Sequence, residues 1–191
     1  LPISAAAQIS EAHVLTLSRS GTVMEALRRA DPAPTVTVAV SEPGGEGIGV
    51  AEELSDAGLS VTLLPDTAVP RRLNEASIDA VLVGADTVLS SGAVANKVGT
   101  YGAALAAQRA NTPLYAACAV DKISVDEASA DEFAPTRAVY DGPADINVWA
   151  PRFDTTPAAL VTGGLLTERG PLTTDEVGAV AEELAGLRDW T

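Results

Sequence analysis

The residues best suited to chemistry lie in one stretch, where Asp86 ends an apolar run and Asn96 and Lys97 follow about ten residues later. An aspartate at the carboxyl end of a strand is placed to act as a general acid or base, or to bind a hydroxyl group. The Lys97 ammonium can neutralise a phosphate, while the Asn96 amide can cap a helix and contact a ligand oxygen. In the alternative interpretation, Asp86 caps a turn and Lys97 is a solvated surface charge.

The scarcity of lysine favours the functional interpretation. Of the 12 basic residues, only Lys97 and Lys122 are lysines, and the others are arginines. Lys122 also follows an apolar run, so we expect it at the same edge of a parallel sheet as Asp86, where such sheets bind their ligands. Two scarce lysines at one edge predict a site for an anionic small molecule.

A second candidate is the loop after the first apolar run, which consists of Ser18, Arg19, Ser20, Gly21 and Thr22. Hydroxyl groups, a glycine and the free N–H groups of a helix start suit the binding of a phosphate. A capped loop without any ligand is the alternative interpretation.

Other cofactor and metal sites are disfavoured by the residues present. The glycine-rich segment Ser41–Gly49 has Glu52 where a dinucleotide fingerprint needs its third glycine, so we reject NAD and expect no cofactor. The segment stays a possible active-site loop. His13 is the only histidine and Cys118 the only cysteine, which excludes a Cys2His2 zinc site and an intrachain disulfide, and we expect no metal. Cys118 ends an apolar run, so we interpret it as a buried, inert thiol.

Strand-like and helix-like patterns alternate along the chain, which predicts an α/β protein with a Rossmann-like, doubly wound parallel sheet. The strand-like runs are rich in Val and Leu with little polar alternation, as expected for strands covered on both faces. The expected strands are His13–Leu17, Thr35–Val40, Ser60–Leu64, Ala80–Gly84 and Leu114–Cys118, and the expected helices are Thr22–Arg29, Glu46–Ala57, Thr67–Ala76, Lys97–Ala110 and Thr174–Leu187.

Two later segments lack this regularity. Ser124–Trp149 is acidic and irregular, so we expect an excursion over the surface or towards a partner. Phe153–Gly170 is rich in residues that favour turns.

Charge and hydropathy exclude several classes of partner. The net charge is −14 with a pI near 4.3, which disfavours binding to nucleic acid phosphates. The acidic, lysine-poor composition is similar to that of halophile proteins. The apolar runs fall well short of the roughly 20 residues needed to cross a bilayer, and we expect a cytoplasmic protein with no membrane partner.

Several motifs resemble those of the translation initiation factor 2B alpha/beta/delta family, which includes methylthioribose-1-phosphate and ribose-1,5-bisphosphate isomerases. They occur in order through nearly the whole chain, so their combination is far more specific than any one motif. The matching segments are Leu15–Val23, Asp66–Val69, Val81–Asp86, Asn96–Tyr101, Phe153–Pro157 and Leu166–Gly170.

The resemblance implies roles for the candidate residues. Asp86 matches the acid/base aspartate of the family's isomerases, Asn96 and Lys97 match a substrate-holding pair, and Lys122 matches a lysine found after the next strand. The isomerases carry a catalytic cysteine where this chain has Ser18, and a serine is a poor acid/base near neutral pH. Factor subunits typically have serine there.

The family's N-terminal helical domain has no counterpart within residues 1–191, so we expect a single Rossmann-like domain over that range. It is then the C-terminal part of a larger protein, or its site is completed otherwise.

Three functions follow as alternatives. Ser18 favours a regulatory protein of the initiation factor 2B-like type that binds a phosphorylated sugar or a nucleotide. The retained Asp86, Asn96, Lys97 and Lys122 fit an aldose–ketose isomerase, an intramolecular oxidoreductase. The third is an oligomeric scaffold with a vestigial site. We also expect a homodimer, because a small domain has too little interior to bury several apolar residues, namely Phe133, Val148, Trp149 and Phe153.

Overall fold

The computed structural model, which describes residues 2–75, 77–125 and 132–188, contains a mostly parallel central sheet. Within those residues the order is β10-β9-β7-β4-β1-β2-β3, and only β10 runs antiparallel to its neighbour. The order reverses between β1 and β4, which creates the switch point where ligands bind in open sheets. The strands are β1 (His13–Thr16), β2 (Thr35–Ala39), β3 (Ser60–Leu64), β4 (Ala80–Gly84), β7 (Leu114–Ala117), β9 (Gly164–Thr167) and β10 (Gly170–Leu172).

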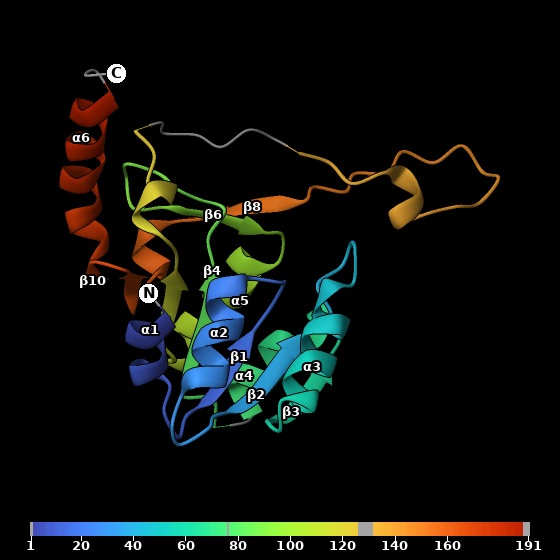
Figure 1. The fold of residues 1–191 in the computed structure, drawn as a ribbon. Coiled ribbons are helices and arrows are strands. Elements are labelled where there is room, and N and C mark those ends of the chain that lie inside the picture. The colour runs from blue at the N-terminus through green and yellow to red at the C-terminus, as the bar shows by residue number, and fades with distance from the viewer. Residues whose placement is uncertain (1, 76, 126–131, 189–191) are drawn as a thin grey trace.

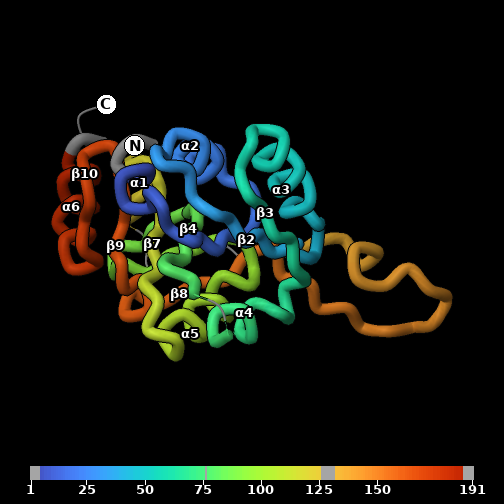
Figure 2. The backbone as a smooth tube through the Cα atoms, turned by 90° about the horizontal axis from the view of Figure 1, so that it is seen from below, coloured from blue at the N-terminus to red at the C-terminus, as the bar shows by residue number. Residues whose placement is uncertain are grey.

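Helices cover both faces of this sheet (Figures 1 and 2). Two separate apolar clusters show the same division, since side chains of α1, α2 and α3 pack on one face and those of α4, α5 and α6 on the other. The doubly wound α/β fold is therefore confirmed. The helices are α1 (Pro2–Gln8), α2 (Gly21–Arg29), α3 (Glu46–Asp56), α4 (Val69–Glu75), α5 (Thr100–Ala110) and α6 (Val177–Arg188).

The helix expected to begin at Lys97 was wrong at its start. Asn96 and Lys97 end strand β6 (Val94–Lys97), and α5 begins at Thr100 after Gly99, whose φ of 103° suits glycine. β6 lies between β5 (Thr87–Val88) and β8 (Phe153–Thr156) in an antiparallel sheet, and Lys97 pairs with Phe153. A partner strand so distant in sequence stabilises β6 where local pattern alone favours a helix.

Smaller boundary differences concern the remaining helices. α2 begins at Gly21, one residue before the expected start at Thr22, and is capped by Ser20, whose hydroxyl accepts from the N–H of Val23. The helices expected at Thr67–Ala76 and Thr174–Leu187 each open with a 3-10 turn, Asp66–Ala68 before α4 and Thr174–Glu176 before α6. Ala76, the expected end of the first of these helices, lies outside the described residues.

The expected surface excursion takes the form of an arm, which we define as residues 132–152. It projects far from the sheet (Figure 1). Its base is an antiparallel pairing in which Ala134 N–H donates to Ala150 O and Arg152 N–H donates to Glu132 O. A 3-10 turn, Thr136–Ala138, lies farther out. Residues 126–131 of the expected excursion lie outside the described residues.

Within the described residues, no helix is long and apolar enough to cross a membrane.

Candidate active site

A cavity of about 710 Å³ lies at the carboxyl ends of β1, β4 and β7, beside the switch point. Its walls come from the loops after these strands, the start of α3, the end of β6 and the base of the arm. Every site residue expected from the sequence lines it: Ser18, Arg19, Ser20, Gly21, Thr22, Asp86, Asn96, Lys97 and Lys122. The structure therefore brings these residues together around one cavity, and the assignment of roles to them stays a prediction.

The loop after β1 is held in a specific shape by its neighbours. Ser18 has a left-handed backbone with φ of 62°, and its N–H donates to Ser41 Oγ over 2.6 Å. Ser41 in turn is fixed by Asp66, whose carboxylate accepts from the backbone N–H of Ser41. The loop leads into the N-terminus of α2, where the helix dipole favours an anion.

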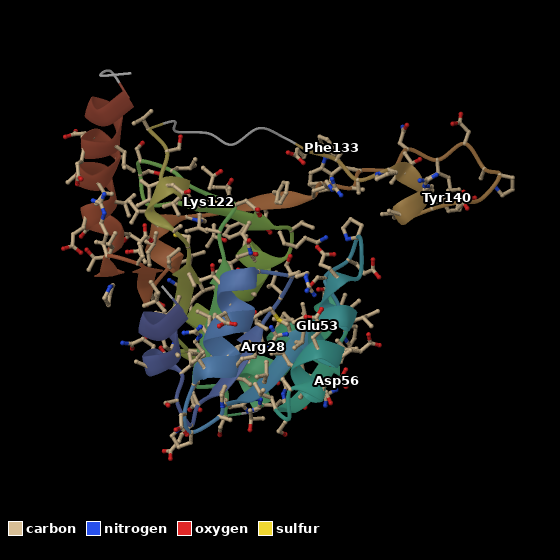
Figure 3. The ribbon with its side chains drawn as sticks, viewed as in Figure 1. Arg28, Glu53, Asp56, Lys122, Phe133 and Tyr140 are labelled. Carbon is tan, nitrogen blue, oxygen red and sulfur yellow. The ribbon has the colours of Figure 1, made fainter. Side chains whose placement is uncertain are left out.

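Arg19 already forms an ion pair with a carboxylate of the protein. Its guanidinium lies 2.6 Å from the Glu53 carboxylate on α3, and Arg28 on α2 pairs with the same carboxylate over 3.1 Å. Figure 3 shows Arg28 and Glu53 facing one another between the two helices. A ligand must therefore compete with Glu53 for Arg19.

Asp86 reaches the cavity from the turn after β4. Its N–H donates to Ala95 O, which ties the turn to β6. Partial burial raises the pKa of the Asp86 carboxyl, the positive charge of Lys122 opposes that effect, and Glu132 adds to it. A carboxyl group with a raised pKa beside a lysine is a suitable proton donor.

Asn96 and Lys97 are both buried at the end of β6. The Asn96 side-chain amide donates to Thr100 Oγ1 over 3.0 Å, and the Thr100 hydroxyl donates to Lys97 O over 2.6 Å. The Lys97 ammonium lies 2.8 Å from Glu46 Oε1 and also donates to Pro43 O. The lysine is therefore already neutralised by a carboxylate at the cavity wall, which sequence reasoning did not foresee.

The residues that the sequence interpretation missed are Glu46, Arg152 and Phe153, all of which line the cavity. The glycine-rich segment Ser41–Gly49 was a signal for Glu46, because it remained a possible active-site loop. Arg152 and Phe153 are brought to the cavity by the pairing of β8 with β6, which the local sequence does not indicate.

Cys118 lies beside the cavity but is buried. Burial, helped by the negative charges of Glu168 and Asp121, raises the pKa of its thiol to about 12. The group stays protonated near neutral pH, as expected for an inert thiol. Among the residues the structure describes, no cluster of three or more His, Cys, Asp or Glu side chains is arranged to hold a metal ion.

Known proteins resemble this chain in sequence and in fold. Residues 3–174 match the initiation factor 2 subunit family. Methylthioribose-1-phosphate isomerases from Bacillus velezensis and Leishmania braziliensis are 35% identical over 147 residues and 34% identical over 175 residues. These alignments cover 72% and 82% of this chain but 40% and 46% of the relatives, so the chain spans less than half of their length.

Two solved structures from Pyrococcus horikoshii share the fold. The 5-methylthioribose 1-phosphate isomerase superposes with a TM-score of 0.85 at 25% identity, covering 97% of this chain and 58% of the other. The translation initiation factor eIF-2B superposes with a TM-score of 0.76 at 28% identity, covering 90% and 62%.

Proposed function

This chain belongs to the initiation factor 2 subunit family, and we propose that it acts on a sugar phosphate as an aldose–ketose isomerase. The observation that carries the proposal is the cavity at the switch point, where Asp86, Asn96, Lys97 and Lys122 lie together. Relatives named methylthioribose-1-phosphate isomerase support this function over the regulatory one that Ser18 favours.

The charges and hydrogen-bonding groups of the cavity suit a phosphorylated pentose. Lys122 and the N-terminus of α2 attract the phosphate, and Lys97 can join them when its ammonium turns from Glu46. The buried Asn96 amide is oriented by Thr100 and offers its carbonyl oxygen to a sugar hydroxyl. Asp86, with its raised pKa, serves as the acid that protonates the ring oxygen when the sugar opens.

A ³¹P NMR assay of methylthioribose 1-phosphate and ribose 1,5-bisphosphate tests this function directly. We expect a ketose phosphate to accumulate with the wild-type protein, and the rate to fall by roughly 100- to 10,000-fold in Asp86→Asn. An unchanged rate in Asp86→Asn would refute the role of this carboxyl.

The second candidate is a regulatory protein that binds a sugar phosphate or a nucleotide without converting it. Ser18 favours it, because a serine hydroxyl is a weak acid and base. Calorimetric titration with the same sugar phosphates and with AMP separates the two. Binding without product would support the regulatory function, while the absence of both would leave the scaffold function.

A further inference from the structure

An aldose–ketose isomerase needs a proton acceptor as well as the acid that opens the ring. The described residues that line the cavity offer few acceptors. Arg19, Lys97, Lys122 and Arg152 are cations, and the Cys118 thiol, with a pKa of about 12, stays protonated. Glu46 is the remaining carboxylate besides Asp86.

The position of Glu46 fits this role. Glu46 Oε1 lies 2.8 Å from Lys97 Nζ and 3.4 Å from Ser18 Oγ, whose hydroxyl donates to it. The ion pair with Lys97 holds the carboxylate at the cavity wall, and 30% of the side chain remains exposed, so a ligand can reach it. Glu46 thus supplies, next to Ser18, the proton acceptor that the serine hydroxyl cannot provide.

Two glycines allow the loop to bring Glu46 into the cavity wall. A Cβ on Gly47 would lie 1.9 Å from Ala39 O, so only glycine lets α3 start this close to the end of β2. A Cβ on Gly44 would lie 2.6 Å from Glu46 Oε2 and 3.3 Å from Lys97 Nζ, and its φ of 127° also favours glycine. The loop is therefore shaped around the Glu46–Lys97 pair.

We propose that Glu46 is a second catalytic residue, the base of the isomerisation, a role that rests on the proposed function. Asp86 gives its proton to the ring oxygen O4 as the C1–O4 bond breaks. Glu46 takes the hydrogen of C2 as a proton, and the electrons of that C–H bond form the C1=C2 double bond of an enol.

The second half of the reaction restores both carboxyl groups. The enol hydroxyl at C2 gives its proton to the Asp86 carboxylate and becomes the ketone, while Glu46 returns its proton to C1. One hydrogen has moved from C2 to C1, C2 is oxidised and C1 is reduced. Atoms and electrons therefore balance without a redox cofactor.

The test is the steady-state kinetics of Glu46→Gln in the protein as it is purified, with Glu52→Gln as a matched control. Glu52 is an exposed carboxylate on the same helix and does not line the cavity. We expect kcat to fall roughly 100- to 10,000-fold in Glu46→Gln with KM within about threefold, and both constants to stay unchanged in Glu52→Gln.

Chemical rescue separates a proton acceptor from a group that only holds Lys97. Formate added to Glu46→Ala should restore part of kcat, because the small carboxylate can occupy the vacated space. A change in KM alone, full kcat in Glu46→Gln, or a lost kcat that formate does not restore would overturn the role of Glu46. A wild-type protein without turnover would instead refute the isomerase function itself, and the two failures are thereby distinguishable.

Discussion

Ser20 lies directly against the backbone of Gly84, so that a Cβ on Gly84 would come within 2.8 Å of both Cβ and Oγ of the serine. Ser20 caps α2 and Gly84 ends β4, two residues before Asp86. This contact therefore sets the distance between the α2 N-terminus, where an anion binds favourably, and the Asp86 turn. A glycine in a buried strand is otherwise unfavourable, and the close approach of Ser20 explains why position 84 is a glycine.

The first prediction concerns this contact. Gly84→Ala should push Ser20 away, lower the free energy of unfolding by about 1–3 kcal/mol and weaken sugar-phosphate binding. Urea denaturation and calorimetric titration measure the two effects. Gly49→Ala is the control, because a Cβ there has nothing within 4 Å and alanine favours a helix such as α3. Equal stability of the two variants would show that the close contact between Ser20 and Gly84 does not affect stability.

Five of the parallel strands were predictable because they are continuous apolar runs, whereas β9 lies in Phe153–Gly170, where residues that favour turns were noted. Ser60–Leu64 and Ala80–Gly84 have the expected boundaries, and the other three expected strands end one residue earlier than expected. The sheet of β5, β6 and β8 was not predictable, since it depends on pairing between residues far apart in sequence. Lys97 was therefore assigned to a helix that begins only at Thr100.

The candidate site was likewise predictable only in part. Asp86 and Lys122 follow predicted strands, so their approach to one another could be inferred from topology alone. The glycine-rich segment Ser41–Gly49 pointed to the neighbourhood of Glu46, but no sequence pattern indicates that its side chain enters the cavity. Its direction depends on the close contacts at Gly44 and Gly47, which exist only in three dimensions.

The second prediction is the pH dependence of turnover. Asp86 must be protonated to donate, so kcat should fall as the pH rises through the pKa of this carboxyl. Lys122 holds that pKa down against the effect of burial, and Lys122→Met should therefore move the decline of kcat to higher pH. A profile of kcat against pH measures the shift. A decline at the same pH in Lys122→Met would exclude Asp86 as its source, whatever the change in KM.

The third prediction concerns the contact between strand β8 and the start of helix α5. The Asp154 carboxylate on strand β8 accepts from Gly99 N–H over 2.7 Å and from Tyr101 N–H over 3.1 Å. It thereby provides hydrogen-bond acceptors for backbone N–H groups at the start of α5. Asp154→Ala should lower the free energy of unfolding by about 1–2 kcal/mol, as for other helix caps.

Asp154→Asn is the matched comparison for that cap. Burial raises the pKa of Asp154 although the two N–H groups oppose this, so its charge is costly where it lies. The asparagine keeps an accepting oxygen and removes the charge, and it should cost less than the alanine in urea denaturation. Equal losses in both variants would show that the charge, not the hydrogen bond, stabilises the helix start.

The fourth prediction tests the proposed homodimer through the arm. Trp149 is 80% exposed and Val139 61% exposed, on a segment that projects from the body, and Phe133 lies at its base (Figure 3). A second copy of the chain would cover these side chains. Trp149→Glu should therefore convert a dimer into a monomer in sedimentation at micromolar concentration, while Leu105→Glu, an exposed position on α5, should not.

Salt gives this prediction a second, independent measurement. Each copy carries a net charge of −14, so two copies repel one another at low ionic strength. Added salt screens that repulsion beyond about 10 Å at 0.1 M and also strengthens apolar contacts when the anion is sulfate. The proposed dimer should therefore tighten as salt rises, since the side chains proposed to form its contacts are apolar and the two copies carry charge of the same sign. Dissociation by salt would point to ion pairs instead, and a wild-type monomer under all conditions would refute the dimer.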